Sequence, residues 1–198
     1  IVVIVNPKLP IKSIADLIAA AKAQPNALNY SSNGSGSSQH MAAALFESLT
    51  GVKMVHVPYK GSSEGVVAVV RGDVNVMFAN MPPAMPLISD GRVRPIAVTS
   101  PKRVAAFPNL PTVAEAGVPG FDVSAWFAIY VPAATPQDIV QRLNKEFGAA
   151  LADADIRAKL AVQGYIIHGG SPQDLGALVR SETVKWAKVV KETGAKAE

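Results

Sequence analysis

The 198-residue chain contains no cysteine. This absence excludes thiol catalysis, disulfide bonds and thiolate metal sites, and it fits an oxidising compartment in which stray thiols are a liability. Charged residues make up only 17% of the chain and apolar residues 49%, which favours a folded protein with a real core over a disordered one. No apolar run approaches the roughly 20 residues that a membrane-spanning helix needs.

The chain also lacks the residue patterns of common enzymes and nucleic-acid binders. Its three histidines, His40, His56 and His168, have no carboxylate at metal-ligand spacing, and its acidic residues do not fall in catalytic pairs. Residues 34–38 match neither a nucleophile elbow nor a phosphate-binding loop. The basic residues are scattered despite a net charge of +4, so no nucleic-acid surface is expected. These absences favour binding without chemistry and without a cofactor.

The most informative segment that is present runs from residue 29 to residue 40, with the sequence NYSSNGSGSSQH. The segment is typical of a strand end, a glycine- and serine-rich turn, and the start of a helix that Gly51 would terminate. Such a turn directs backbone N–H groups and the positive end of the helix dipole at one point, which favours a carboxylate or phosphate. An ordinary helix cap is the alternative, because serine is a preferred capping residue. His40 is expected to support this turn or to pack beside it.

Apolar strands alternate with capped amphipathic helices along the chain. We expect strands at 1–5, 28–31, 54–58, 74–78, 94–99 and 123–131. We expect helices at 13–24, 41–49, 63–71, 81–90, 112–115 and 135–151. A further helix is expected to follow directly and to end near 163, and a last helix is expected to begin at 171 and to run towards the C-terminus. This alternation predicts a largely parallel sheet with helices on both faces. Ligands of such sheets gather at the carboxyl ends of the strands, so the turns at 31–38, 59–63, 79–82 and 99–103 are expected to line a cleft.

Three further features have two interpretations each. Trp126 and Phe127, in the expected strand at 123–131, belong either to the core or to a wall of the cleft. Lys60 either supplies positive charge to the cleft or lies exposed in a turn. The segments TPQD at 135–138 and SPQD at 171–174 each place a hydroxyl residue before a proline, which predicts a capped helix start rather than an internal repeat.

Blocks along nearly the whole chain resemble the Bug family, the substrate-binding proteins of tripartite tricarboxylate transporters. The blocks lie at 29–40, 54–61, 76–80, 96–100, 110–117 and 126–127. The resemblance implies an α/β, type II periplasmic-binding-protein-like fold of two lobes, each with a mostly parallel sheet flanked by helices. It further implies a periplasmic, non-enzymatic protein that closes over a small organic anion, often a di- or tricarboxylate. The partner implied for delivery of the anion is the membrane permease of a tripartite transporter.

Family members look roughly half as long again, with the additional part at the N-terminal side. The resemblance therefore implies that residues 1–123 form the complete second lobe and residues 124–198 the C-terminal part of an incomplete first lobe, with a hinge near 123–131. The chain begins inside an apolar strand, Ile1–Val5, which leads us to expect a trimmed or truncated product. A partial lobe would expose apolar faces and favour self-association.

The resemblance carries over a set of ligand-binding residues. The anion-binding turn comprises Ser31, Ser32, Asn33, Gly36, Ser37 and Ser38, and the second wall of the site comprises Ala79 and Asn80. The family usually has aspartate where this chain has Ala79, so a ligand amine would lose a counter-charge here. A purely anionic or neutral ligand is therefore expected rather than an amino acid.

Two other functions compete with that of a transporter's solute receptor. A ligand-sensing module would use the same fold to report a bound molecule to a signalling partner. A hydrolase would use Ser37 with His40, but the sequence places no carboxylate to orient that histidine.

Overall fold

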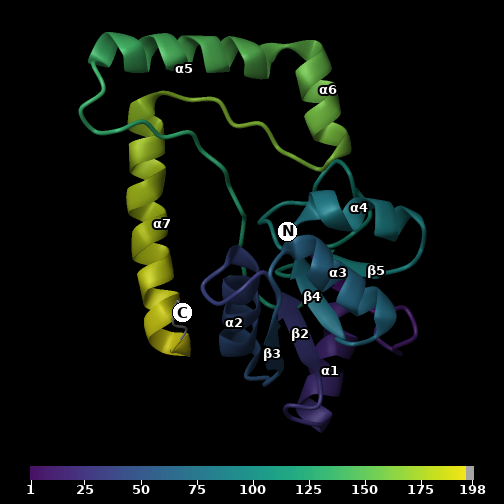
Figure 1. Cartoon of the computed structure of the whole chain (residues 1–198). Helices are drawn as coiled ribbons and strands as arrows, with labels where there is room; N and C mark the ends of the chain where they lie inside the picture. Colours follow the sequence, from purple (N-terminus) through teal and green to yellow (C-terminus); the bar gives the residue numbers. More distant parts are fainter. Residues whose placement is uncertain (195–198) are drawn as a thin grey trace. The chain divides into compact units, whose positions relative to one another are not determined.

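The computed structural model describes residues 1–194, apart from the side chain of Glu192. These residues form two compact units (Figure 1). The first unit contains Ile1–Ala125 together with the C-terminal residues from Lys188 onward, and the second contains Trp126–Ala187.

The first unit is built on a five-stranded sheet with the strand order β3-β2-β4-β1-β5. The strands are β1 (Val2–Val5), β2 (Asn29–Ser32), β3 (Val55–Pro58), β4 (Val76–Ala79) and β5 (Arg94–Val98). The helices are α1 (Ile14–Ala23), α2 (Ser38–Thr50), α3 (Ser62–Arg71) and α4 (Met81–Ser89). Each of these elements was expected from the sequence, with boundaries that differ by a few residues.

The strand directions confirm a mostly parallel sheet, with β1 as the antiparallel exception. Strand β2 pairs in parallel with β3 and β4. Strand β1 lies between β4 and β5 and is antiparallel to both, so the sheet is mixed. All four residues of β1 are fully buried. A short run that is apolar on both faces carries no sequence signal for its direction, which is why the alternation of elements suggested a parallel strand.

Helices cover both faces of this sheet. Met77 and Ala79 of β4 belong to an apolar cluster with residues of α3 and α4. The intervening residue, Phe78, contacts Phe46 of α2, with ring centroids 5.5 Å apart. Because successive side chains of a strand point to opposite faces, α2 packs on one face and α3 and α4 on the other.

The segment 123–131 is not the long strand that the sequence suggested. The amide of Val123 donates to the carbonyl of Thr99 at 2.9 Å, but the residues from Ser124 to Val131 have no strand assignment. An extended segment becomes a strand only beside a partner that completes its hydrogen-bond ladder, and the described residues provide none here. Trp126 is 38% exposed and Phe127 is 75% exposed, so neither is a core residue.

The second unit is helical. It contains α5 (Gln137–Ala152), α6 (Ala154–Val162) and most of α7 (Pro172–Thr193). Ser171 caps α7 as expected, because its hydroxyl accepts the Asp174 amide at 3.2 Å. Thr135 does not cap α5, whose N-cap is Pro136 without a side-chain hydrogen bond. Among the described residues, no helix combines the length and the apolar character needed to cross a membrane.

In the loop before residue 123, the expected short helix at 112–115 is replaced by turns. Thr112 and Glu115 form both hydrogen bonds of a capping box, each at 3.0 Å, as the sequence indicated. The residues that follow form turns rather than a helix. The capping box closes a single turn because Gly117, with φ of +104°, redirects the chain immediately afterwards.

Candidate functional site

Three helices of the first unit begin at the same edge of the sheet. Strands β2, β3 and β4 run in one direction, and α2, α3 and α4 start directly after them. The N-cap residues of these helices are Ser37, Gly61 and Asn80. Because a helix N-terminus carries partial positive charge and unpaired N–H groups, this shared edge favours a negatively charged ligand.

The turn between β2 and α2 confirms the helix-cap interpretation, whereas anion binding by the turn stays a prediction. Gly34 and Gly36 have φ angles of +111° and +76°, a region that glycine enters without strain. The hydroxyl of Ser37 accepts the amide of His40 at 3.3 Å and therefore caps α2. The amides of Ser38 and Gln39 belong to the first helical turn and have no intrahelical acceptor. Ser38 has accessible surface, whereas Gln39 is fully buried, so the amide of Ser38 is the one that an anion could reach.

Gln39 connects this turn to the start of the next helix. Its side chain is fully buried. The amide oxygen accepts the backbone N–H of Asn33 at 2.9 Å, and the amide nitrogen donates to the hydroxyl of Ser62 at 2.6 Å. A buried, fully bonded amide fixes the groups that it joins, so the turn after β2 and the first residue of α3 are held together.

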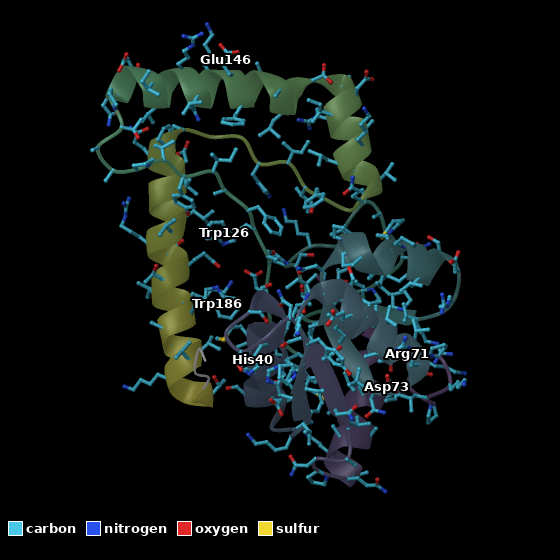
Figure 2. The ribbon with its side chains drawn as sticks, viewed as in Figure 1. His40, Arg71, Asp73, Trp126, Glu146 and Trp186 are labelled. Carbon is cyan, nitrogen blue, oxygen red and sulfur yellow. The ribbon has the colours of Figure 1, made fainter. Side chains whose placement is uncertain are left out.

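Two histidines lie against the same turn. His56 of β3 approaches the hydroxyl of Ser32 with its Nε2 at 2.6 Å. The ring of His40, labelled on α2 in Figure 2, stacks on that of His56 with centroids 4.3 Å apart. The Nδ1 atom of His40 accepts the amide of Gly36 at 3.0 Å. The expectation that His40 supports or packs beside the turn is confirmed.

The second expected wall consists of one buried residue and one residue with an unpaired oxygen. Ala79 is fully buried in the apolar cluster under α3 and α4. Asn80 begins α4, but its side chain makes no capping hydrogen bond. Its Oδ1 atom is buried and has no hydrogen-bond partner among the described residues. A buried acceptor of this kind requires a donor, which a bound water or a ligand can supply.

The structure separates the expected site residues into two groups. Ser31, Ser32 and Ala79 are fully buried, and the hydroxyl of Ser31 donates to the carbonyl of Gly65 on α3 at 3.1 Å. The residues with accessible surface are Asn33, Gly36, Ser37, Ser38 and Asn80. The exposed turn after β3 contains Lys60, whose side chain is solvent-exposed.

Sequence reasoning missed the roles of Gln39, His56 and Ser62. A buried glutamine beside a serine-rich turn has no distinctive spacing. The role of His56 depends on strand register, because β2 and β3 pair so that His56 lies next to Tyr30. Knowledge of that pairing is the signal that would have found His56.

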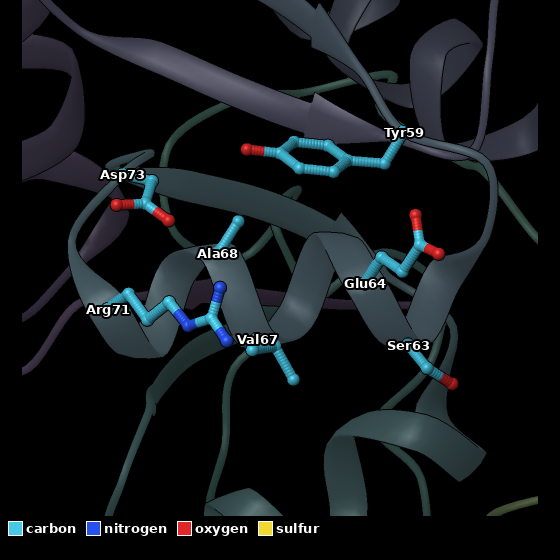
Figure 3. Close-up of a pocket in the computed structure, with 7 residues that line it drawn as sticks. All are labelled: Tyr59, Ser63, Glu64, Val67, Ala68, Arg71 and Asp73. Carbon is cyan, nitrogen blue, oxygen red and sulfur yellow. The ribbon is translucent and has the colours of Figure 1, made fainter.

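A separate cavity of about 380 Å³ lies along α3 (Figure 3). Its lining residues are Tyr59, Ser63, Glu64, Val67, Ala68, Arg71 and Asp73. The charged groups of this lining are solvent-exposed and of both signs, so they favour no single ligand charge. None of the expected site residues lines this cavity.

The arrangement of Ser37 and His40 does not form a hydrolytic pair through Nδ1. The hydroxyl of Ser37 accepts the backbone amide of His40, and the Nδ1 of the histidine is occupied by the amide of Gly36. A nucleophilic serine needs its hydroxyl hydrogen-bonded to the ring of a base. The two side chains instead stabilise the turn and the first turn of α2.

Comparison with known proteins points to one family. The family model described as "Tripartite tricarboxylate transporter family receptor" matches residues 1–195. Protein BugT of Bordetella pertussis is 37% identical over 196 residues, which cover 99% of this chain and 60% of BugT.

Two solved structures with bound acids are also similar. The structure of R. palustris Rpa4515 with adipate has a TM-score of 0.93 and 40% identity, and the match covers 98% of this chain and 65% of that one. MatC (Rpa3494) from Rhodopseudomonas palustris with bound malate has a TM-score of 0.85 and 29% identity, with coverages of 96% and 65%. The chain thus spans less than two thirds of each of these proteins.

Proposed function

The chain belongs to the tripartite tricarboxylate transporter receptor family, and on this premise we propose that it is part of a periplasmic protein that captures a small organic carboxylate. The family consists of solute-binding receptors rather than enzymes. The observation that carries the proposal is the meeting of three helix N-termini and a glycine- and serine-rich turn at one sheet edge. These groups supply hydrogen-bond donors and partial positive charge to an anion without any catalytic group.

The proposed ligand class is a dicarboxylate. The structural relatives hold adipate and malate, which share two carboxylates and carry no amine. Ala79 provides no counter-charge for an amine, which agrees with that class. The unpaired Oδ1 of Asn80 would accept a hydrogen bond from a ligand hydroxyl or from a water molecule that the ligand holds.

We propose that the site residues act in two ways. The backbone amides of Asn33, Gly36 and Ser37 are already hydrogen-bonded within the turn. The donors offered to the ligand are the side-chain amide of Asn33, the hydroxyl of Ser37, and the hydroxyl and backbone amide of Ser38. Gly36 lets the backbone approach the ligand, and Asn80 contacts the ligand from the opposite wall. The buried residues Ser31, Ser32 and Ala79 shape the ends of the strands from which those donors project.

The proposed organisation is a two-lobe receptor that closes over its ligand. Residues 1–123 would be the second lobe and residues 124–198 part of the first lobe, with a hinge at 123–131. The boundary between the two compact units, after Ala125, falls inside that hinge and supports it. The ligand would stabilise the closed state through contacts that exist only in that state.

The proposed partners are the permease subunits of a tripartite transporter and, for this chain alone, a second copy of itself. Self-association is supported by the exposed apolar residues after Trp126. Phe127 is 75% exposed, Ile129 61% and Tyr130 62%. Adjacent exposed apolar side chains of this kind mark surfaces that other protein covers.

Thermal unfolding of the chain with adipate, malate or acetate tests carboxylate capture. Binding at about 100 times the dissociation constant stabilises a protein by about 2.7 kcal/mol, so a dicarboxylate should raise the melting temperature and acetate should do so less. The absence of any effect from either dicarboxylate would contradict the proposal for this chain.

Two matched glycine variants locate the site. Gly36→Ala and Gly117→Ala both place a side chain at positive φ, at +76° and +104°, and should lower stability by similar amounts of about 1 kcal/mol. Only Gly36→Ala should also weaken dicarboxylate binding, measured by titration calorimetry. Equal weakening by both variants would show that the turn after β2 is not the site.

A further inference from the structure

The side chain of His40 reaches back from the first turn of α2 to the glycine-rich turn before it. Its Nδ1 lies 3.0 Å from the amide nitrogen of Gly36. A backbone amide can only donate a hydrogen bond, so Nδ1 must carry a lone pair, and the ring proton of the neutral imidazole is on Nε2. The bond therefore requires one tautomer of an uncharged ring.

A stack of rings fixes the orientation of His40. The rings of His40 and His56 are 4.3 Å apart at their centroids and inclined by 12°. The ring of His56 stacks in turn on Tyr30 of β2, at 5.1 Å and 20°. Tyr30 is only 2% exposed, so the stack is anchored in the core of the first unit.

The turn that receives this support contains two glycines at positive φ. Gly34 and Gly36 give the backbone more accessible conformations than any other residue would. A binding turn that is disordered before binding loses affinity, because the ligand must supply the free energy that orders it. His40 and Gln39, which are adjacent in the sequence, each hold one amide of the turn, those of Gly36 and Asn33.

We propose that His40 is a positioning residue of the carboxylate site, which holds the Gly36 amide in place through Nδ1 while the stack on His56 aims the ring. This inference rests on the proposed function, which makes the turn part of a carboxylate site. The role requires no contact between His40 and the ligand. It requires a hydrogen-bond acceptor at the position of Nδ1, and in the wild type the stacked ring holds that acceptor in place.

Two substitutions separate the acceptor from the ring. His40→Phe keeps a planar ring that can stack on His56 but has no acceptor. His40→Asn keeps an acceptor at a position close to that of Nδ1 but removes the ring. If His40 only fills space, His40→Phe should be tolerated better than His40→Asn, and the positioning role predicts the opposite order. His168→Phe, at an exposed histidine of the second unit, is the matched control.

Hydrogen exchange of the Gly36 amide, measured by NMR on the ¹⁵N-labelled chain without ligand, is the first readout. Loss of one hydrogen bond should accelerate exchange at Gly36 by roughly fivefold or more in His40→Phe. Exchange in His40→Asn and His168→Phe should stay within about twofold of the wild type. The amide of Phe78 in β4 reports whether each variant retains the fold.

Adipate affinity, measured by calorimetry on the same proteins, is the second readout. His40→Phe should weaken binding by roughly fivefold or more, and His40→Asn should restore most of the affinity. The inference is overturned if Gly36 exchanges equally fast in the wild type and His40→Phe, or if His40→Asn exchanges as fast as His40→Phe. It is also overturned if the wild type binds adipate and His40→Phe binds it equally well. A wild type that binds no adipate contradicts the proposed function of the chain, whereas the exchange at Gly36 still decides the role of His40.

Discussion

Gly65 lies where α3 packs most closely on the sheet. It is buried, and a β-carbon at this position would lie 2.9 Å from Cε and 3.2 Å from Sδ of Met77 on β4. The same carbon would lie 3.3 Å from the hydroxyl oxygen of Ser31, which donates to the Gly65 carbonyl at 3.1 Å. Replacement of Gly65 by alanine would therefore force α3 or these two side chains to move.

The expected effect of Gly65→Ala combines three contributions. The higher helix propensity of alanine stabilises by about 1 kcal/mol. Overpacking of a tight core destabilises by about 1–3 kcal/mol, and a strained hydrogen bond from Ser31 adds about 1 kcal/mol. Because the flexible end of Met77 can absorb part of the overlap, we expect a net destabilisation of about 1–2 kcal/mol.

Urea unfolding followed by far-ultraviolet circular dichroism measures this change. The matched control is Gly148→Ala in α5, where a β-carbon would meet no atom within 4 Å, so only the propensity gain of about 1 kcal/mol should remain. Both tryptophans, Trp126 and Trp186, lie in the second unit, so their fluorescence follows that unit separately. A Gly65→Ala protein that is as stable as the wild type would refute the packing argument.

Three further predictions concern the caps, a half-buried acid and the exposed apolar segment. Ser171→Ala should lower the free energy of unfolding in urea by about 1 kcal/mol and Thr135→Ala by less than about 0.5 kcal/mol, because only the former removes a helix cap; equal losses would contradict this. Burial raises the pKa of the Glu47 carboxyl, so the folded state keeps that proton to a higher pH than the unfolded chain does. The free energy of unfolding should therefore fall as the pH rises above the usual carboxyl range. Glu47→Gln should flatten that fall when urea unfolding is repeated from about pH 4 to pH 7, and an unchanged profile would exclude Glu47 as its cause. Phe127→Ser should reduce self-association in sedimentation velocity, and a wild-type chain that sediments as a monomer would contradict the proposed second copy.

Short-range chemistry explains why most elements could be predicted from the sequence. Helix α2 ends at Gly51 and α3 at Gly72, with φ angles of +71° and +88° that favour glycine. Ser13 caps α1 by accepting the amide of Asp16 at 3.1 Å. Each signal lies within a few residues of the boundary that it sets, so the sequence contains it directly.

Most of the features that local patterns missed depend on partners far along the chain. The direction of β1 is set by its place between β4 and β5, and the apolar run Val2–Val5 would suit either direction. The segment 123–131 has the composition of a strand but no neighbouring strand among the described residues. TPQD and SPQD look equivalent, yet only Ser171 caps its helix, because a hydroxyl residue can cap only from the N-cap position, which Pro136 occupies at the start of α5.

In the candidate site too, local features could be predicted from the sequence and contacts between distant segments could not. The turn at 31–38 could be located because its glycines, serines and following helix are consecutive. The links made by Gln39 to Ser62 and by His56 to Ser32 join different strands and helices, and they depend on the register of β2 and β3. Resemblance to a family supplied the function that local patterns could not.

The antiparallel strand β1, which lies between β4 and β5, has a consequence for the order in which the protein folds. Strand β1 pairs with residues 76–79 and 94–98, whereas β2, β3 and their helices lie close together in the sequence. Pairings between distant segments form slowly, because a long loop must close before any contact compensates for the lost entropy. Until β4 and β5 are available, Val2–Val5 presents an unpaired, β-branched run, the kind of segment that pairs with other chains. We expect β1 and β5 to join the sheet last, so chaperone protection would matter most for β1.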